Sequence, residues 1–348
     1  MPIESLRPLT NKLHRLVGHH MRELTELAVE RWEISPAETR EVPPVILLPG
    51  QAERVTAVEF ASREAVMASL PGDPAEHIPA TMGYRLRDVD FVDGVLYAGS
   101  SELHLRRRSH LALPLRHPRR NLSGALYETW VGNRWFGNWL LDDCLSYRLA
   151  ETTGRPVTST PPRGGHVPRY EELLGMSPER IGDAHFDDLI LFDDHHNNSG
   201  RIARAQDMRA RLLKGRDPAP NPGIFLFRGG SGDARILENE AEIAENLQAR
   251  YGFRVMFPEA HTVDELLDAC GATRIVAGIE GSQLNHGLAV MPPGGTLLTM
   301  QPADRTTTAM KLLTDRWQQR FALLVGRGTA RGFRIEWDEV QRTLDLIL

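Results

Sequence analysis

Two stretches decide the fold of this chain: residues 224–228, which read IFLFR, and residues 274–285, which read RIVAGIEGSQLN. Each begins with a short apolar run that is typical of a buried strand. The first run ends in Arg228, which precedes a glycine-rich turn and a charged helix. The second leads into Gly278 and Gly281, where another helix is expected to begin. Both strands are therefore predicted to bring polar groups to one edge of a sheet, an arrangement that suits a phosphate-bearing ligand.

Around these stretches, the second half of the chain alternates strands with helices. Strands are expected at 224–227, 253–257, 274–277, 296–299 and 321–325, and helices at 238–250, 262–270, 282–290, 305–319 and 337–347. Thr262 and Glu265 have the spacing of a capping box at the start of the second helix. This alternation predicts an α/β fold with a parallel sheet covered by helices on both faces.

The first half of the chain has a less regular pattern. We expect an amphipathic helix at 10–32, strands at 45–48, 55–60, 89–97 and 189–192, and helices at 137–149 and 202–213. Three prolines in residues 215–223 indicate a linker, because proline disfavours both helix interiors and central strands. The predicted division is a helical segment at 1–40, an α/β domain at 41–214, the linker, a second α/β domain at 224–330, and a C-terminal helix at 331–348 that packs back across the boundary.

Composition excludes several classes of protein. A chain of 348 residues with 41% hydrophobic and 25% charged residues is ordinary for a soluble globular protein, and its net charge of −5 gives no reason to expect nucleic acid as a partner. Its two cysteines, Cys144 and Cys270, are too few for a zinc site or a disulfide framework, so buried thiols are expected. No apolar run approaches the ~20 residues that span a bilayer. No signal-peptide pattern is seen, so we expect a cytoplasmic protein.

Contact with a membrane surface is an open alternative at two places. The amphipathic helix at 10–32 suits either a surface of the domain, a contact between copies of the chain, or a contact with lipid. Basic runs at 106–108 and 116–120 suit either a solvated face or an anionic partner such as a membrane surface or an acidic acceptor. The sequence decides neither the oligomeric state nor whether the protein is peripheral to the inner membrane.

Candidate ligand-binding residues follow the predicted strands of the second half. In an open parallel sheet, ligands bind outside the carboxyl ends of the strands. Arg228 and Arg235 can hold phosphate oxygens, while the carboxylate of Glu280 suits sugar hydroxyls. The fingerprint G-x-G-x-x-G after the first strand is absent, and neither glycine-rich run carries the lysine of a P-loop. These absences argue against a nicotinamide cofactor and against ATP hydrolysis.

The order of these residues resembles glycosyltransferase family 61. That family has a strand ending in arginine, then R-x-x-x-N-E, a P-E pair, and G-x-x-G-[AS]-x-L-x-[NH]. The corresponding residues here are Arg228, Arg235 with Asn239 and Glu240, Pro258 with Glu259, and residues 278–286. Upstream, residues 136–142 read FGNWLLD and resemble the family segment F-G-H-W-L-x-D. The chain departs from the pattern at Asn138 and Glu280, where many family members have histidine.

The resemblance implies a fold, an activity and a set of site residues. The implied fold is GT-B-like, with two Rossmann-like domains facing a cleft, the first on the acceptor side and the second binding the sugar nucleotide. The implied activity is that of an inverting, metal-independent hexosyl- or pentosyltransferase without cofactors, moving a sugar from a nucleotide donor, UDP being the expected one. The acceptor is a saccharide or glycolipid in surface-polysaccharide synthesis, of the capsular type found in bacteria. The donor-binding residues are Arg228, Arg235, Asn239, Glu259, Glu280, Gly281, Ser282 and Asn285.

Inversion needs a general base to deprotonate the acceptor hydroxyl. Asp142 is the first candidate and Asp143 the second, and both also suit a simple role at the start of a helix. The segment 193–196, Asp-Asp-His-His, is open to three interpretations: an acceptor contact, a metal site of a hydrolase, or a polar loop. The departures at Asn138 and Glu280 also motivate an alternative function, a non-catalytic subunit that binds sugar nucleotides within a polysaccharide-assembly complex.

Overall fold

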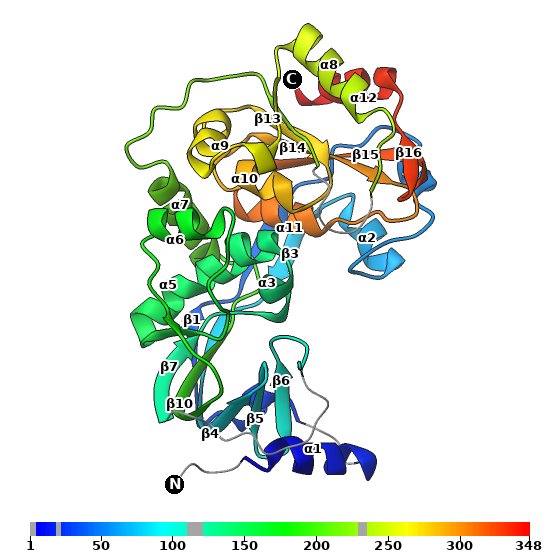
Figure 1. The fold of residues 1–348 in the computed structure, drawn as a ribbon. Helices are drawn as coiled ribbons and strands as arrows, with labels where there is room; N and C mark the ends of the chain where they lie inside the picture. Colours follow the sequence, from blue (N-terminus) through cyan, green and yellow to red (C-terminus); the bar gives the residue numbers. More distant parts are fainter. Residues whose placement is uncertain (1–4, 19–21, 110–120, 229–234) are drawn as a thin grey trace. The chain divides into compact units, whose positions relative to one another are not determined.

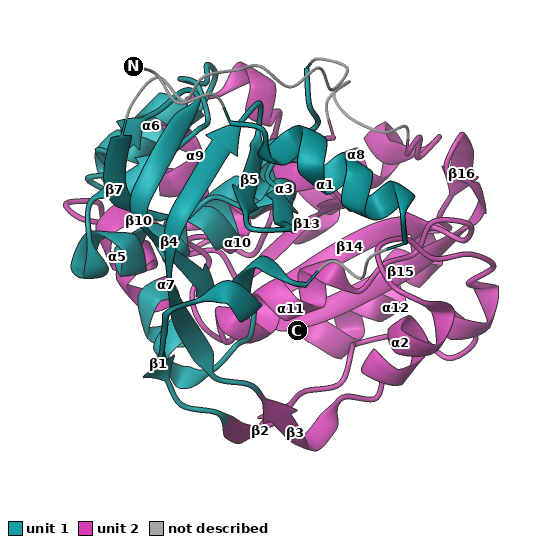
Figure 2. Cartoon of the chain, turned by 90° about the horizontal axis from the view of Figure 1, so that it is seen from below, with its two compact units in different colours: residues 1–37, 79–204 teal, residues 38–78, 205–348 magenta. Residues whose placement is uncertain are grey.

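The structure is a computed structural model that describes residues 5–18, 22–109, 121–228 and 235–348. The chain divides into two compact units, shown in different colours in Figure 2. Unit 1 contains residues 1–37 and 79–204, and unit 2 contains residues 38–78 and 205–348. Each unit is thus built from two separate stretches of sequence.

Unit 2 contains the parallel sheet predicted from the sequence. Its strands are β11 (Ile224–Leu226), β12 (Arg254–Met256), β13 (Ile275–Ile279), β14 (Thr296–Pro302), β15 (Arg320–Thr329) and β16 (Gly332–Arg334). They lie in the order β12-β11-β13-β14-β15-β16, and all neighbours are parallel except β15 and β16. The first two strands therefore run in the reverse spatial order to the next three, which places a topological switch between β11 and β13.

Helices cover both faces of this sheet, as predicted. They are α8 (Glu240–Tyr251), α9 (Val263–Cys270), α10 (Asn285–Leu288), α11 (Ala309–Arg316) and α12 (Trp337–Ile347). Figure 1 shows α8 and α12 on one side of the strands and α9, α10 and α11 on the other. Leu247 of α8 and Leu344 of α12 pack in one hydrophobic cluster with Ile275 and Leu298 of the sheet. The capping box of Thr262 and Glu265 is confirmed at the start of α9.

Residues 38–78 differ most from the prediction. They form α2 (Arg63–Ser69), the 3₁₀ turn η2 (Ala52–Arg54) and the antiparallel pair β2 (Glu38–Val42) and β3 (Asp73–Ile78). The strands expected at 45–48 and 55–60 are wrong, because each stretch makes only a single bridge, from Ile46 to Ala322 and from Val58 to Thr306. Pro44 precedes the first of these bridges, and proline cannot donate to a ladder. Since both bridges join unit 2, this stretch lies outside the continuous first domain that the sequence suggested.

Unit 1 is built on a mixed sheet. Its strands are β1 (Glu30–Ser35), β4 (Thr81–Val92), β5 (Val95–Ala98), β6 (Ser101–His104), β7 (Asn121–Leu126), β8 (Pro156–Thr158), β9 (Glu179–Arg180) and β10 (Ala184–Asp193). They lie in the order β6-β5-β4-β10-β7-β8-β9, and β1 also pairs with β4. The run from β10 to β9 is parallel. The single strand expected at 89–97 is instead the end of β4, a turn at Gly94, and β5.

The helices described next confirm those predicted at 137–149 and 202–213 and correct the one predicted at 10–32. They are α1 (Arg7–Leu16), α3 (Trp130–Arg134), α4 (Phe136–Asn138), α5 (Cys144–Thr153), α6 (Val167–Leu173) and α7 (Ser199–Leu212), whose last residues belong to unit 2. The helix expected at 137–149 is present, with a π-helical turn at Trp139–Asp143. The helix expected at 10–32 is wrong: α1 ends at Leu16, Gly18 is left-handed with φ of 74°, and the chain continues as a 3₁₀ turn, η1 (Leu24–Leu27), before β1.

Some predictions fall on residues outside the described ranges, namely 19–21 of that helix and the basic run at 116–120. Cys144 and Cys270 are both buried and free, as expected. Within the described residues, none of the helices has the length and apolar character needed to cross a membrane.

Candidate functional site

The carboxyl ends of β11 and β13 form the most distinctive polar cluster in unit 2. Arg228 lies two residues after β11, and Glu280 follows directly after β13. Helices leave the two strands toward opposite faces of the sheet, which is the arrangement at which open α/β sheets bind ligands. The topology therefore brings together residues that are 52 positions apart in sequence.

Glu280 is the centre of this cluster. Its main-chain oxygen accepts hydrogen bonds from Arg228 Nη1 at 2.9 Å and from Arg235 Nη1 at 3.0 Å. Its carboxylate Oε2 lies 3.0 Å from Arg235 Nε and 3.5 Å from Arg305 Nη1. Arg235 and Glu280 are only 8% and 6% exposed. The two predicted donor residues Arg235 and Glu280 are thus a largely buried ion pair, with Arg228 bonded to the same residue.

Several arginine side chains meet in this cluster. The guanidinium groups of Arg235 and Arg305 lie at the carboxylate of Glu280, and that of Arg228 lies at its main-chain oxygen. A second carboxylate, Glu59, is 3.8 Å from Arg305 Nε but lies on a side chain that is 43% exposed. Because guanidinium groups match phosphate oxygens in a two-pronged geometry, these arginines suit an anionic ligand such as a diphosphate.

Gly281 has a steric reason to be glycine. A Cβ atom added to it would lie 1.9 Å from Arg228 Nη1 and 2.5 Å from Gln283 Oε1. The guanidinium group of Arg228 can therefore cross the main chain at residues 280–281 only because this residue has no side chain. The sequence pattern alone did not distinguish this role from helix–strand packing.

The helix predicted to begin at 282 is shorter than expected. Ser282–Leu284 is a 3₁₀ turn, and α10 that follows is a single turn of α-helix. A dipole of this length is a weak source of positive charge, since the macrodipole builds up over several turns. Asn285 is 4% exposed, and no described residue forms a hydrogen bond with its Oδ1. The donor contacts assigned to Gly281, Ser282 and Asn285 stay predictions.

The remaining two donor candidates lie in different surroundings. Asn239 is 5% exposed, and its Nδ2 donates to the main-chain oxygen of Ile335 at 2.8 Å, which ties the start of α8 to the segment before α12. This bond gives Asn239 a structural role whether or not it contacts the donor. Glu259 is exposed, in the 3₁₀ turn η4 (Pro258–Ala260) that follows β12. Both assignments stay predictions.

Glu240 adds a pH-sensitive group beside the arginines. Its Oε1 accepts a hydrogen bond from the main-chain N–H of Arg228 at 3.2 Å. Burial raises the pKa of Glu240 from 4.5 to about 7, although that hydrogen bond and the charge of Arg228 both act to lower it. The carboxyl is thus largely neutral below pH 7, which leaves the positive charge of the arginines less compensated.

We expect this raised pKa to make stability fall as the pH rises. The folded protein binds the Glu240 proton more tightly than the unfolded chain does, so protonation of Glu240 stabilises the fold. This stabilisation is complete below the pKa of Glu240 in the unfolded chain, and it is lost as the pH rises through about 7. The variant Glu240→Gln retains a hydrogen-bond acceptor but has no carboxyl to titrate. Its free energy of unfolding, minus that of wild type, should therefore rise by about 1–2 kcal/mol between about pH 5 and about pH 8, a value reduced because the side chain is partly exposed.

Urea unfolding at several pH values measures this difference. The exposed neighbour Glu238 supplies the control Glu238→Gln, which should run parallel to wild type at every pH. A constant difference between Glu240→Gln and wild type over the whole range would contradict the expectation.

In unit 1, the two candidate bases differ in environment. Asp142 lies in the π-helical turn and its side chain is 16% exposed. Its Oδ2 accepts from Asn138 Nδ2 at 2.9 Å and its Oδ1 accepts from Arg201 Nη2 at 2.7 Å. Asp143 is 1% exposed, and Oγ1 of Thr129 donates to it at 2.8 Å. Burial, with the negative charges of Asp142 and Glu128, holds the pKa of Asp143 well above its usual range.

These surroundings favour Asp142 over Asp143 as a base. A base must be ionised and must reach the proton that it removes. The raised pKa of Asp143 opposes the first requirement, and its burial opposes the second. The residue that departs from the family segment, Asn138, donates directly to Asp142. The amide of Asn138 therefore helps to orient this carboxylate.

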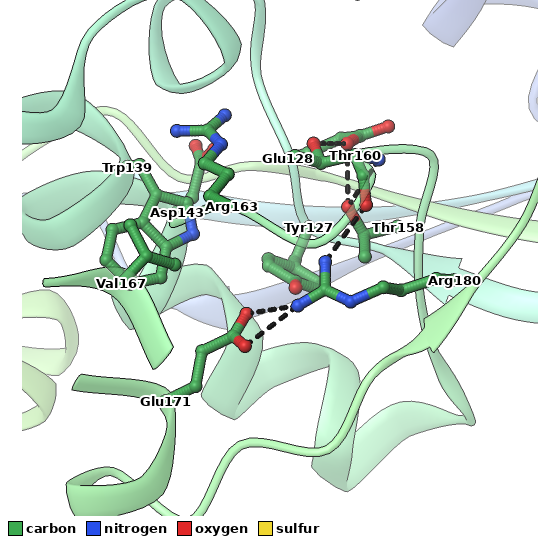
Figure 3. A pocket seen from close by; sticks show the side chains of 10 residues that line it. All are labelled: Tyr127, Glu128, Trp139, Asp143, Thr158, Thr160, Arg163, Val167, Glu171 and Arg180. Atoms are coloured by element: carbon green, nitrogen blue, oxygen red, sulfur yellow. Dashed lines mark hydrogen bonds and ion pairs between the residues drawn. The ribbon is translucent and has the colours of Figure 1, made fainter. Parts of the chain in front are cut away.

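A small polar pocket lies beside Asp143 (Figure 3). Its lining includes Glu128, Trp139, Asp143, Thr158, Arg163 and Arg180. The space open to the centre of a water molecule is about 10 Å³, close to the ~10–15 Å³ that a single water needs. Glu128 accepts hydrogen bonds from Thr158, Ser159 and Thr160, and Arg180 pairs with Glu171 at 2.6 Å. The pocket is too small for a sugar, and the hydrogen bonds of Glu128 connect the segment after β7 to the end of β8.

The segment 193–196 does not form a metal site in the described structure. Asp194 is buried, and its carboxylate accepts from Thr81, Ser146 and Arg204 at 3.1, 2.9 and 2.5 Å. No group of three His, Cys, Asp or Glu side chains suited to a metal ion occurs among the residues that the structure describes. Arg201, fully buried, joins Asp194 to Asp142. The segment therefore supports the position of Asp142, and its neighbour His195 is exposed.

A family model described as Glycosyltransferase 61 matches residues 18–298. The chain belongs to glycosyltransferase family 61. The match spans most of the chain and includes Asp142, the switch between β11 and β13, and all eight predicted donor residues. This glycosyltransferase therefore acts on a sugar donor and an acceptor. A comparison with curated proteins finds no match.

Two residues of these polar clusters were missed by the sequence interpretation. Arg305 lies three residues beyond β14, at the same sheet edge. It is outside the family match, which ends at residue 298. The strand-end rule that selected Arg228 could have found it. Arg201 lies in a helix without any motif, and only the structure shows that it binds Asp142.

Proposed function

We propose that this glycosyltransferase moves a hexose or pentose from a UDP-sugar to a saccharide or glycolipid acceptor, with inversion at the anomeric carbon and without a required metal ion. The observation that carries the proposal is the set of three arginines around Glu280 at the switch between β11 and β13. Guanidinium groups gathered at this place suit the diphosphate of a nucleotide sugar.

The chemistry of transfer gives these groups a task. The acceptor oxygen attacks C1 of the donor sugar, the bond from C1 to the diphosphate oxygen breaks, and UDP leaves with the added negative charge. Arg228, Arg235 and Arg305 would stabilise that charge, the task that a metal ion performs in other transferases. Glu280, held between Arg235 and Arg305, is placed to accept hydrogen bonds from ribose or sugar hydroxyls.

The acceptor side of the proposal rests on unit 1. Asp142 takes the proton of the attacking hydroxyl, while Arg201 and Asn138 fix the orientation of its carboxylate. A GT-B-like arrangement, with unit 2 holding the donor and unit 1 the acceptor, is the arrangement that the family resemblance favours. The resemblance likewise supports a role in bacterial surface-polysaccharide assembly.

Calorimetry with the full chain tests the proposal. UDP should bind, UMP should bind more weakly because it lacks the second phosphate, and uridine should bind least. A thermal-shift screen of nucleotide sugars then selects the donor, since a ligand of the native state raises its apparent stability. With that donor, transfer should continue in EDTA, and NMR of the product should show the inverted anomer.

Each part of the proposal has its own contrary result. Equal affinities for UDP and uridine would contradict the assignment of a diphosphate site. Loss of transfer in EDTA, restored only by a divalent ion, would contradict the proposal that transfer needs no metal. Binding of UDP-sugars without transfer or hydrolysis across a broad panel would favour the non-catalytic subunit instead.

A further inference from the structure

Helix α1 is oriented with its polar side inward. Amphipathic helices of globular proteins normally bury the apolar stripe and expose the polar one. In α1 the buried residues are Pro8 and Asn11, whereas the leucines are exposed. The helix lies beside β5 in unit 1 (Figure 1).

Polar contacts hold the inward side. Asn11 is fully buried, and its Nδ2 donates to the main-chain oxygen of Ser101 at 3.2 Å. Arg7 Nη1 donates to the main-chain oxygens of Asp88 and Tyr97 at 2.5 and 3.3 Å. Arg15 pairs with Glu102 at 2.5 Å. Several specific bonds thus fix which side of α1 faces outward.

The outward side is an apolar stripe. Its members are Leu6, Leu9, Leu13, Leu16 and Val17, which are 52%, 38%, 52%, 73% and 70% exposed. At about 100° per residue these side chains fall within an arc of roughly 100°. Single exposed leucines are normal, but a contiguous set on one arc marks a contact surface.

The charge around the stripe indicates what covers it. Residues 5–18 contain three basic residues, Arg7, Lys12 and Arg15, and no acidic one. Lys12 is exposed and lies at the edge of the arc. Arg7 and Arg15 are paired with Asp88 and Glu102 on the inward side, so the exposed Lys12 is the basic residue beside the stripe. A symmetric pairing of two copies through this stripe would bring two such lysines to one contact. An anionic lipid surface would instead attract Lys12 while burying the leucines.

We propose that α1 is an interfacial helix that docks unit 1 on anionic phospholipid. Its ten residues measure about 15 Å, so it lies in the plane of the surface and does not cross it. The helix precedes the first residue matched by the family model, so the proposal is independent of the family assignment and of the donor site.

Vesicle sedimentation with the full chain tests this docking. The protein should bind phosphatidylcholine vesicles that contain phosphatidylglycerol, should bind pure phosphatidylcholine much more weakly, and should dissociate as salt is raised. The double variant Leu13→Ser/Leu16→Ser should bind the anionic vesicles at least about 100-fold more weakly, about tenfold for each leucine. Lys12→Glu should also weaken binding.

The matched control is Leu312→Ser/Leu346→Ser, which removes two leucines of unit 2 that are 59% and 53% exposed. It should bind vesicles like wild type. Thermal unfolding of each variant should match wild type, because all four leucines are exposed. Equal vesicle binding by Leu13→Ser/Leu16→Ser and wild type would overturn the proposal. The proposal would also be overturned if wild type did not bind anionic vesicles and formed a dimer in solution that Leu13→Ser/Leu16→Ser abolished. UDP affinity, measured without vesicles, separates either failure from failure of the donor site.

Discussion

Arg235→Ala should abolish sugar transfer and weaken UDP binding about 100-fold, the loss expected for two hydrogen bonds to a charged group. Arg235 is 8% exposed and lies against Glu280 through both its Nη1 and its Nε. The variant removes one of three cations and also frees the carboxylate of Glu280 from its closest partner. Donor binding therefore loses an attraction and gains a repulsion.

Calorimetry with UDP and a transfer assay measure the two effects. Arg334→Ala is the matched control, because Arg334 is a half-exposed arginine of the same unit that pairs with Glu242 at 3.1 Å. It should leave both quantities unchanged. Arg235→Lys retains the charge without the two-pronged geometry and should lie between wild type and Arg235→Ala.

Stability must be followed in the same samples. Loss of Arg235 leaves Glu280 with Arg305 at 3.5 Å as its remaining ion-pair partner among the described residues, so some loss of unfolding free energy is expected. If Arg235→Ala unfolds, Arg235→Lys carries the test. Unchanged turnover in a folded Arg235 variant would show that the donor does not bind at this cluster.

Asp142→Asn should lower the rate of transfer by about 10²- to 10⁴-fold while UDP affinity stays at the wild-type value. The amide cannot accept the proton of the acceptor hydroxyl, which is why the chemical step suffers. UDP affinity is preserved because the predicted donor residues belong to unit 2 and Asp142 belongs to unit 1.

The surroundings of Asp142 determine the controls. Arg201 is fully buried, and Asp142 and Asp194 are its carboxylate partners at 2.7 and 3.7 Å. Asparagine retains an oxygen that can accept from Arg201, but the charge is lost, so the unfolding free energy must be measured alongside. Asp187→Asn, at an exposed position in β10, is the matched control and should change neither rate nor stability. An unchanged rate in folded Asp142→Asn would refute its role as the base.

Much of unit 2 could be predicted because its signals are local. The apolar runs at 224–227 and 274–277, the capping box at Thr262 and the prolines of 215–223 each specify their own conformation. Alternation of strands and helices then permits only a parallel sheet covered on both faces, and the structure confirms it. The order of the strand-end motifs was also sufficient to indicate the family.

The predictions failed where the outcome depends on distant partners. The stretches 45–48 and 55–60 are apolar enough for strands, but their neighbours in space are Ala322 and Thr306, and each makes a single bridge. The apolar spacing of residues 10–32 continued past Leu16, yet residues 30–35 pair with β4. Periodicity cannot report such pairings, because it contains no information about which segments meet.

The residue types at the proposed donor site, and the strand ends on which they lie, follow from the sequence alone, since motif order and strand periodicity are local properties. Only the tertiary structure shows that Glu280 lies among three arginines, that Gly281 leaves room for Arg228, and that Asp142 is bound by a buried arginine. It alone shows that the leucines of α1 face outward. These features depend on side chains far apart in the chain, whose meeting is set by packing and by hydrogen bonds of the folded protein.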